Sequence, residues 1–210
     1  MPPGPGNSVF LAVPCLGEVR WETALAIQKM AARYGGALEV CYLSNVPIEM
    51  ARDVLASRFL ATAHPNLLFL DADIRPPDGF LDLVDRKLPV VAGWCPVMTR
   101  DFELYPNLFR RKEGGGYQPC WEESEGLIEV DAVGMGCTLI RREVFERLKR
   151  PWFAFEPDPK DGERWTGEDM SFCRKVQEAG FRIHAAPAMK CGHMKTLDLL
   201  ALYQGSRRTP

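Results

Sequence analysis

Two aspartates separated by a single residue follow a short apolar run in the first half of the chain. Residues 67–70 are all apolar, and they lead directly into Asp71, Ala72 and Asp73. Two carboxylates this close at the end of a buried strand repel each other unless a cation compensates them. Mg²⁺ and Mn²⁺ prefer oxygen ligands and leave coordination sites for substrate phosphates. We therefore predict that Asp73 holds Mn²⁺ or Mg²⁺ on a diphosphate, while Asp71 faces the ribose or shares the metal. A solvated turn is the alternative.

A second acidic pair, Glu168 and Asp169, stands at the start of a helical pattern in the last quarter of the chain. Thr166 could cap this helix with Asp169 three residues later, and acidic residues favour helix N-termini in any case. The functional interpretation is a carboxylate on a rigid element that accepts a proton from an acceptor hydroxyl. The two interpretations are compatible for neighbouring residues.

One histidine and one glycine motif add to these acids. His193 follows Cys191 and Gly192, and beside a carboxylate metal site it is a candidate third ligand, because Mn²⁺ accepts imidazole as well as oxygen. A packed or surface histidine is the alternative. Gly134-Met135-Gly136 either lets the backbone approach a sugar or acceptor closely or forms a bulge.

The first half of the chain predicts the elements that position these residues. Strands are expected at residues 9–13, 37–43 and 67–70, separated by two amphipathic helices. The buried faces of these helices are predicted at Ala24, Ile27, Ala31 and Tyr34 and at Ile48, Ala51, Leu55 and Phe59. Strands that alternate with helices indicate a doubly wound sheet, in which ligands bind outside the carboxyl ends of the strands. Asp71 and Asp73 lie at that end.

The second half predicts a mixed extension of the same sheet. After a strand at 90–93, short antiparallel strands are expected within 105–110, 117–121 and 127–133. A strand at 138–141, a helix at 143–148, a proline-rich loop at 151–166, a helix at 168–179 and extended pieces at 182–185 and 188–193 follow. We expect one α/β domain over residues 1–210, with a core at about 8–195 and a loosely held C-terminal tail.

Composition sets the remaining expectations. The chain has 210 residues, of which 46% are hydrophobic, and a formal net charge of -2, so no strong attraction to nucleic acid or membranes is visible. No apolar stretch approaches the roughly 18–20 residues of a membrane span, and the first residues lack the features of a secretory signal. We expect a cytoplasmic protein whose seven scattered cysteines are reduced and mostly buried.

These motifs, in this order, resemble the GT-A glycosyltransferases of the family 2 type. The resemblance covers roughly residues 9–193. It rests on Asp71-Ala72-Asp73, on the segment that begins Gly134-Met135-Gly136-Cys137, on Gly167-Glu168-Asp169, on residues 172–180 and on Gly192-His193. It implies a GT-A fold, which is Rossmann-like with a mostly parallel mixed sheet flanked by helices. It also implies transfer of a hexosyl group from a nucleotide-diphosphate sugar, such as a UDP- or GDP-sugar, with Mn²⁺ or Mg²⁺.

The resemblance also implies roles for the matching positions. Pro14 and Cys15 would contact the nucleobase, Asp71 the nucleotide, and Asp73 with His193 the metal. Residues 134–136 would shape the sugar and acceptor site, and Asp169, assisted by Glu168, would be the catalytic acid pair. Arg52 falls where related sequences place an arginine near the donor, although Asp53 follows it here where asparagine is usual.

Other functions remain open at this stage. A sugar nucleotidyltransferase would use the same sheet and metal, but residues 14–17 are not a glycine-rich phosphate loop, and the same turn lacks the G-x-G-x-x-G of a dinucleotide-dependent oxidoreductase. A non-catalytic nucleotide-sugar-binding protein is a further alternative. The acceptor could be a small molecule, a glycan, a lipid-linked saccharide, a protein or a modified DNA base. The sequence leaves both inversion and retention possible.

Overall fold

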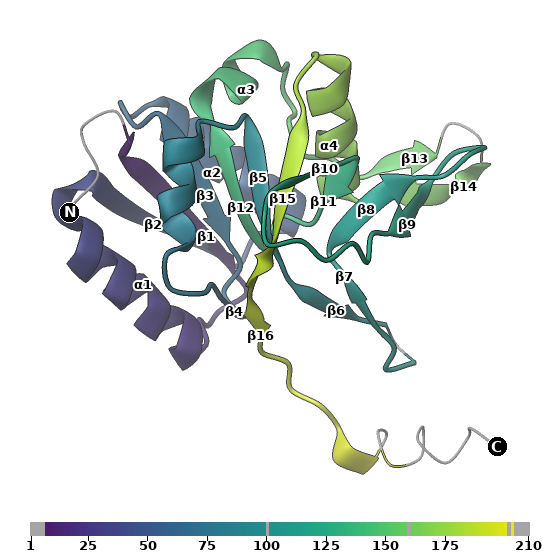
Figure 1. Ribbon diagram of the computed structural model, residues 1–210, viewed down its shortest axis with the longest axis horizontal. Helices are drawn as coiled ribbons and strands as arrows, with labels where there is room; N and C mark the ends of the chain where they lie inside the picture. The colour runs from purple at the N-terminus through teal and green to yellow at the C-terminus, as the bar shows by residue number, and fades with distance from the viewer. Residues whose placement is uncertain (1–6, 100, 159–160, 201–202, 204–210) are drawn as a thin grey trace.

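A seven-stranded sheet forms the centre of the computed structural model, which describes residues 7–99, 101–158, 161–200 and 203 (Figure 1). Its order is β10-β15-β5-β12-β3-β1-β2. The strands are β1 (Val9–Cys15), β2 (Leu38–Ser44), β3 (Asn66–Leu70), β5 (Val90–Trp94), β10 (Ile128–Val130), β12 (Cys137–Arg141) and β15 (Ile183–Lys190). β1, β2, β3, β5 and β15 run parallel, whereas β12 and β10 are antiparallel to their neighbours. The predicted α/β protein with a mixed sheet flanked by helices is confirmed.

Helices cover both faces of this sheet, as Figure 1 shows. The helical elements are α1 (Trp21–Tyr34), η2 (Gly35–Ala37), α2 (Ile48–Leu60), η3 (Phe80–Arg86), α3 (Arg142–Arg147) and α4 (Glu168–Glu178). Side chains of α2, α3 and α4 pack into one apolar cluster with Leu67 and Phe69 of β3. Side chains of α1 and η3 pack into the other with Leu68 and Leu70. The continuous apolar run of β3 is therefore explained by burial on both faces.

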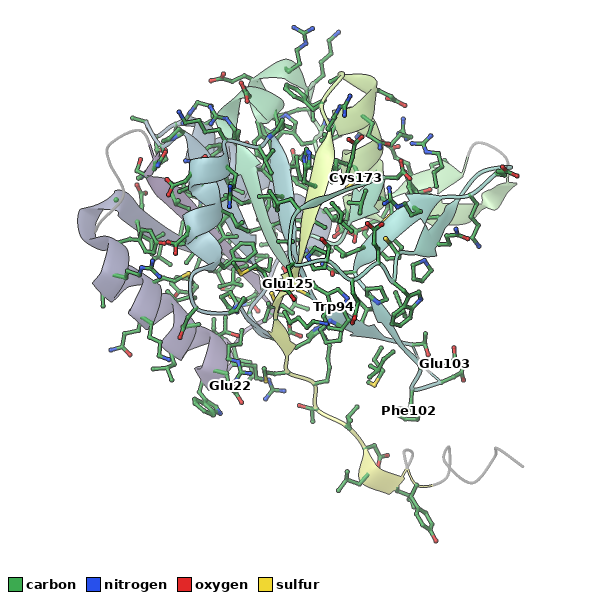
Figure 2. The ribbon with its side chains drawn as sticks, in the orientation of Figure 1. Glu22, Trp94, Phe102, Glu103, Glu125 and Cys173 are labelled. Atoms are coloured by element: carbon green, nitrogen blue, oxygen red, sulfur yellow. The ribbon has the colours of Figure 1, made fainter. Side chains whose placement is uncertain are left out.

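The carboxyl ends of the five parallel strands lie at one edge of the sheet, and the short elements gather there. β4 (Ile74–Arg75) follows β3 after a turn and pairs with β16 (Gly192–His193), which follows β15. The remaining strands are β6 (Pro96–Met98), β7 (Leu104–Pro106), β8 (Leu108–Arg111), β9 (Tyr117–Pro119), β11 (Ala132–Val133), β13 (Glu156–Asp158) and β14 (Asp161–Thr166). Trp94, labelled in Figure 2, ends β5 at this edge, and its carbonyl accepts the Cys191 backbone N–H at 2.8 Å.

Several local predictions were wrong. The proline-rich segment 151–166 is not a loop throughout, because β13 and β14 pair as an antiparallel hairpin within it. In α1, Ala24 and Ala31 are exposed. The buried face is instead formed by Thr23, Ile27 and Tyr34. The large side chains Ile27 and Tyr34 decide which face turns inward, and the two small alanines do not. Extended pieces were predicted at 182–185 and 188–193. The structure instead has one longer strand, β15 (Ile183–Lys190), followed by the short β16 (Gly192–His193).

The seven cysteines are free, and five of them are buried, as predicted. Among the described residues, none of the helices is both long enough and apolar enough to cross a membrane. The predicted loosely held tail falls largely on residues 201–202 and 204–210, which lie outside the described residues.

Candidate active site

A pocket of about 460 Å³ opens at the carboxyl edge of the sheet. Its wall contains Asp71, Ala72 and Asp73 from the turn between β3 and β4, Pro14 and Cys15 from the end of β1, and His193 from β16. The structure thus brings six of the predicted site residues to one pocket. This is where strand order places a ligand in an open α/β sheet.

The turn that carries the aspartates is fixed by backbone hydrogen bonds on both sides. Asp71 donates its backbone N–H to the carbonyl of Gly136 at 2.9 Å, and the carbonyl of Ala72 accepts the N–H of Arg20 at 2.9 Å. The carbonyl of Asp73 accepts the N–H of Met194 at 2.8 Å. These bonds connect the turn to segments from both ends of the chain, so the positions of the two carboxylates depend on the whole fold.

Asp73 and His193 face each other in this pocket. His193 Nδ1 donates to the carbonyl of Pro96 at 2.6 Å, and its Nε2 lies 3.3 Å from Asp73 Oδ2. The Lys195 ammonium contacts the same carboxylate oxygen at 2.6 Å. Burial alone would raise the pKa of Asp73, but hydrogen bonds with His193 and Lys195 outweigh burial and lower this pKa to about 2. Asp73 is therefore an anion throughout the physiological range.

This pair suits a divalent cation. Because Nδ1 donates to a carbonyl, Nε2 is the ring nitrogen that faces Asp73. Histidine ligands of metals are typically oriented in this way, by a hydrogen bond from the other ring nitrogen. The 3.3 Å separation of the two donor atoms resembles that of adjacent ligands around an octahedral ion, which is about 3 Å for metal–ligand distances of about 2.1 Å. In the part of the chain that the structure describes, no three His, Cys, Asp or Glu side chains form a metal-holding group. Asp71 does not complete one.

Asp71 is held instead by Arg52, a buried side chain of α2. Arg52 Nη2 lies 3.1 Å from Asp71 Oδ1 and 3.3 Å from Oδ2, and Arg52 Nε donates to Glu168 Oε1 at 3.2 Å. The guanidinium also lies over the ring of Phe69, at 5.4 Å from its centroid. Arg52 was predicted near the donor, but at 3% exposure it contacts carboxylates on two sides of the site. Arg52 Nη1 is buried without a hydrogen-bond partner among the described residues. Asp71 Oδ1 is buried as well, and its 3.1 Å contact with Arg52 is an ion pair without hydrogen-bond geometry.

Glu168 and Asp169 begin α4 close to this arginine. The N-cap is Gly167, without a side-chain cap, so the prediction that Thr166 caps the helix was wrong. Thr166 is instead the last residue of β14. Asp169 Oδ1 accepts the backbone N–H of Met170 at 2.8 Å. Burial raises the pKa of Asp169, the Glu168 charge raises it further, and Arg52 opposes both, with a resulting pKa of about 6.

The glycine motif lies between the two acidic groups. A Cβ on Gly136 would lie 3.2 Å from Asp71 Oδ2, and a Cβ on Gly134 would lie 3.8 Å from Asp169 Oδ2. The contact at Gly136 is tight, whereas 3.8 Å at Gly134 is ordinary van der Waals contact, and the tight neighbour of Gly134 is the Asn107 Cβ at 3.3 Å. The side chain of Met135 is 1% exposed and packs in the core. Residues 134–136, Arg52, Glu168 and Asp169 are not among the residues that line the pocket.

Sequence reasoning missed the roles of Asn107 and Lys195 at the site, and the role of Asp53 beside Arg52 in α2. Asn107 is buried, accepts the backbone N–H of Cys95 at 2.7 Å and binds Gly134 through its backbone, which fixes the glycine motif. Asp53 accepts the backbone N–H groups of Trp152 and Phe153 at 2.8 and 3.1 Å. Lys195 lies at the end of the predicted core, where no role was assigned to it, and its ammonium contacts Asp73. Of these three residues, only Asp53 could have been noticed in the sequence, because it follows Arg52 at a position where asparagine was expected.

Comparisons with known proteins show the fold and no more. No family model matches the chain, and no curated protein matches it. The crystal structure of A197 from STIV superposes with a TM-score of 0.65 at 24% identity, over 90% of this chain and 86% of that chain. UDP-glucose pyrophosphorylase complexed with UDP-glucose gives a TM-score of 0.46 at 12% identity, over 95% of this chain and 80% of that chain. The first comparison shows a shared fold, and the second is too distant to carry an argument.

Proposed function

We propose that this chain is a metal-dependent glycosyltransferase of the GT-A type, which transfers a hexosyl group from a UDP- or GDP-sugar to an acceptor hydroxyl. In this proposal Asp73 and His193 hold Mn²⁺ or Mg²⁺, Pro14 and Cys15 border the nucleobase, and Asp71 faces the nucleotide. Asp169 is the catalytic base, and Glu168 assists it. The backbone of residues 134–136 borders the transferred sugar and the acceptor.

The observation that carries this proposal is that Asp71, Asp73 and His193 line one pocket at the carboxyl edge of the sheet, with His193 Nε2 3.3 Å from Asp73 Oδ2. The contrast between the pKa values of Asp73 and Asp169 supports it. Asp73 has a lowered pKa of about 2 beside His193, as suits a permanent anion that binds a cation. Asp169 has a raised pKa of about 6, as suits a base that takes up and releases a proton near neutral pH. Two carboxylates with pKa values driven apart at one sheet edge support separate roles in binding and proton transfer.

The chain's own residues supply the steps of the reaction as follows. When bound, the divalent cation supplies positive charge that stabilises the departing nucleoside diphosphate. Asp169 Oδ1 is engaged by the Met170 N–H, so Oδ2, which faces Gly134, is the oxygen that accepts the acceptor's proton. The acceptor oxygen then forms its bond to the anomeric carbon as the bond from that carbon to the diphosphate breaks. The proton stays on Asp169, and the electron pair leaves with the diphosphate.

A nucleotide screen by thermal shift tests the proposal. Purified protein is heated with UDP, GDP or their sugars, each in Mn²⁺ or in excess EDTA. A ligand at 100 times its Kd stabilises a protein by about 2.7 kcal/mol, so we expect a clear rise in Tm with UDP or GDP compounds in Mn²⁺ and a smaller one in EDTA.

A second arm of the screen separates the alternatives. The stabilising sugar nucleotide is incubated with candidate acceptors, and nucleoside triphosphate is incubated with sugar 1-phosphate. Glycosidic product in the first incubation supports the transferase, whereas pyrophosphate release in the second would assign a nucleotidyltransferase. Stabilisation without product in either would favour the non-catalytic alternative, and the absence of any stabilisation would refute the donor assignment.

A further inference from the structure

Lys195 occupies the position at Asp73 where a cation is expected. Its ammonium lies 2.6 Å from Asp73 Oδ2, the oxygen that His193 Nε2 also approaches, at 3.3 Å. The Lys195 side chain is 45% exposed, so it can leave this position without burying its charge elsewhere. The structure therefore shows Asp73 already compensated by a cation that belongs to the protein.

The backbone around Lys195 is tethered on both sides. Met194 donates its N–H to the carbonyl of Asp73 at 2.8 Å, and the Arg20 guanidinium donates a hydrogen bond to the Thr196 hydroxyl. All of these residues line the same pocket. Figure 1 shows the chain continuing past β16 beyond the edge of the sheet. A Lys195 side chain that leaves Asp73 consequently remains at the pocket.

Lys195 is also the pocket cation best able to change partner. Arg20 bonds Thr196 and lies 3.8 Å from Glu18, so it is held in the wall. Arg52 is buried between Asp71 and Glu168. A divalent cation on Asp73 Oδ2 would repel the Lys195 ammonium from the same oxygen, because like charges at such a separation are strongly unfavourable.

We propose that Lys195 is a donor-binding residue that changes places with the divalent cation: it compensates Asp73 while the cation is absent, and it contacts the donor diphosphate once the cation occupies Asp73. This inference rests on the proposed function, since it assumes the cation and the diphosphate. It adds a residue that the resemblance did not supply, and it predicts that Lys195 opposes metal binding while it favours nucleotide binding.

The test measures both equilibria in Lys195→Met, which keeps the length of the side chain and removes its charge. Mn²⁺ affinity without nucleotide is measured by electron paramagnetic resonance, and affinity for UDP and for GDP in saturating Mn²⁺ by calorimetry. Removing a half-exposed competing ion pair should tighten Mn²⁺ binding roughly three- to fivefold. Loss of one charged contact to a phosphate should weaken binding of the diphosphate roughly tenfold.

A matched control makes the result decisive, as does the expectation that Lys195→Met tightens Mn²⁺ binding while it weakens nucleotide binding. Lys190→Met removes a comparably exposed lysine that lies over Trp94, outside this pocket, and both affinities should stay unchanged. A purely structural role for Lys195 would weaken both ligands, so weakening of both, or an unchanged Mn²⁺ affinity, overturns the inference and leaves the proposed function standing. Failure of the wild-type protein to bind Mn²⁺ or either nucleotide refutes the proposed function itself, and the inference with it.

Discussion

Replacing Glu168 by glutamine should move the pH dependence of the reaction in a defined direction. Asp169 acts as a base only when ionised, so the rate is lost as the pH falls through its pKa of about 6. The Glu168 charge is the second largest cause that raises this pKa, after burial. Glutamine removes the charge but keeps an oxygen that can accept the Arg52 hydrogen bond. The pKa of Asp169 should therefore fall.

The size of the effect follows from the order of these causes. The Asp169 pKa of about 6 exceeds the ordinary value of 3.8 by about two pH units, and burial, which the substitution leaves in place, is the larger contribution. We therefore expect the midpoint of the acid limb to fall by roughly one pH unit. At pH 5 the ionised fraction of Asp169 would then rise from roughly one tenth to roughly one half.

The assay is kcat/KM against pH for sugar transfer, or for donor hydrolysis while the acceptor is unknown. Asp73, whose pKa is about 2, stays ionised over this range and does not contribute to the limb. Glu129→Gln is the control, because Glu129 pairs with exposed Arg182 and lies outside the site. A midpoint in Glu168→Gln that is unchanged or higher would refute the assignment of Asp169 as the base.

Three further predictions concern stability and space. Arg52→Met leaves Asp71 and Glu168 without their buried partner, so the free energy of unfolding in urea should fall by about 3–5 kcal/mol; a loss below about 1 kcal/mol would show that the two ion pairs matter little. Gly136→Ala places a Cβ 3.2 Å from Asp71 Oδ2, so it should displace this carboxylate and weaken nucleotide binding. Gly36→Ala is the control, because the space around its Cβ is open, and nucleotide affinity should stay unchanged. Asp169→Asn should raise Tm above pH 6 and leave it unchanged below about pH 4. The folded protein holds ionised Asp169 less favourably than the unfolded chain does, so the wild type loses stability as the pH rises from the ordinary pKa of 3.8 through about 6, and asparagine avoids this loss. A Tm gain that is equal at all pH values would contradict this.

The parts of the fold that could be predicted were those with strong local patterns. The uninterrupted apolar run of β3 and the spacing of Leu55 and Phe59 in α2 both indicated burial, and both are buried. The hairpin of β13 and β14 could not be predicted, because prolines and charged residues dominate its sequence. The prediction of the buried face of α1 was partly wrong, because small alanines fit either face of a helix.

The residues of the site were easier to predict than their partners. Chain order alone placed Asp71 and Asp73 at the carboxyl end of a strand, and the structure places both in the pocket. The contacts of Arg52 with Asp71 and Glu168 join positions separated by 19 and by 116 residues, which no local pattern reveals. The contact of Lys195 with Asp73 spans 122 residues and depends on the pairing of β16 with β4.

The central claim is that Asp73 and His193 together hold a divalent cation that binds a nucleoside diphosphate. Anomalous diffraction from crystals grown with Mn²⁺ and UDP or GDP tests it most directly. We predict one strong manganese peak within bonding distance of Asp73 Oδ2, His193 Nε2 and a phosphate oxygen. A nucleotide bound in the pocket with no manganese at these two side chains would contradict the claim.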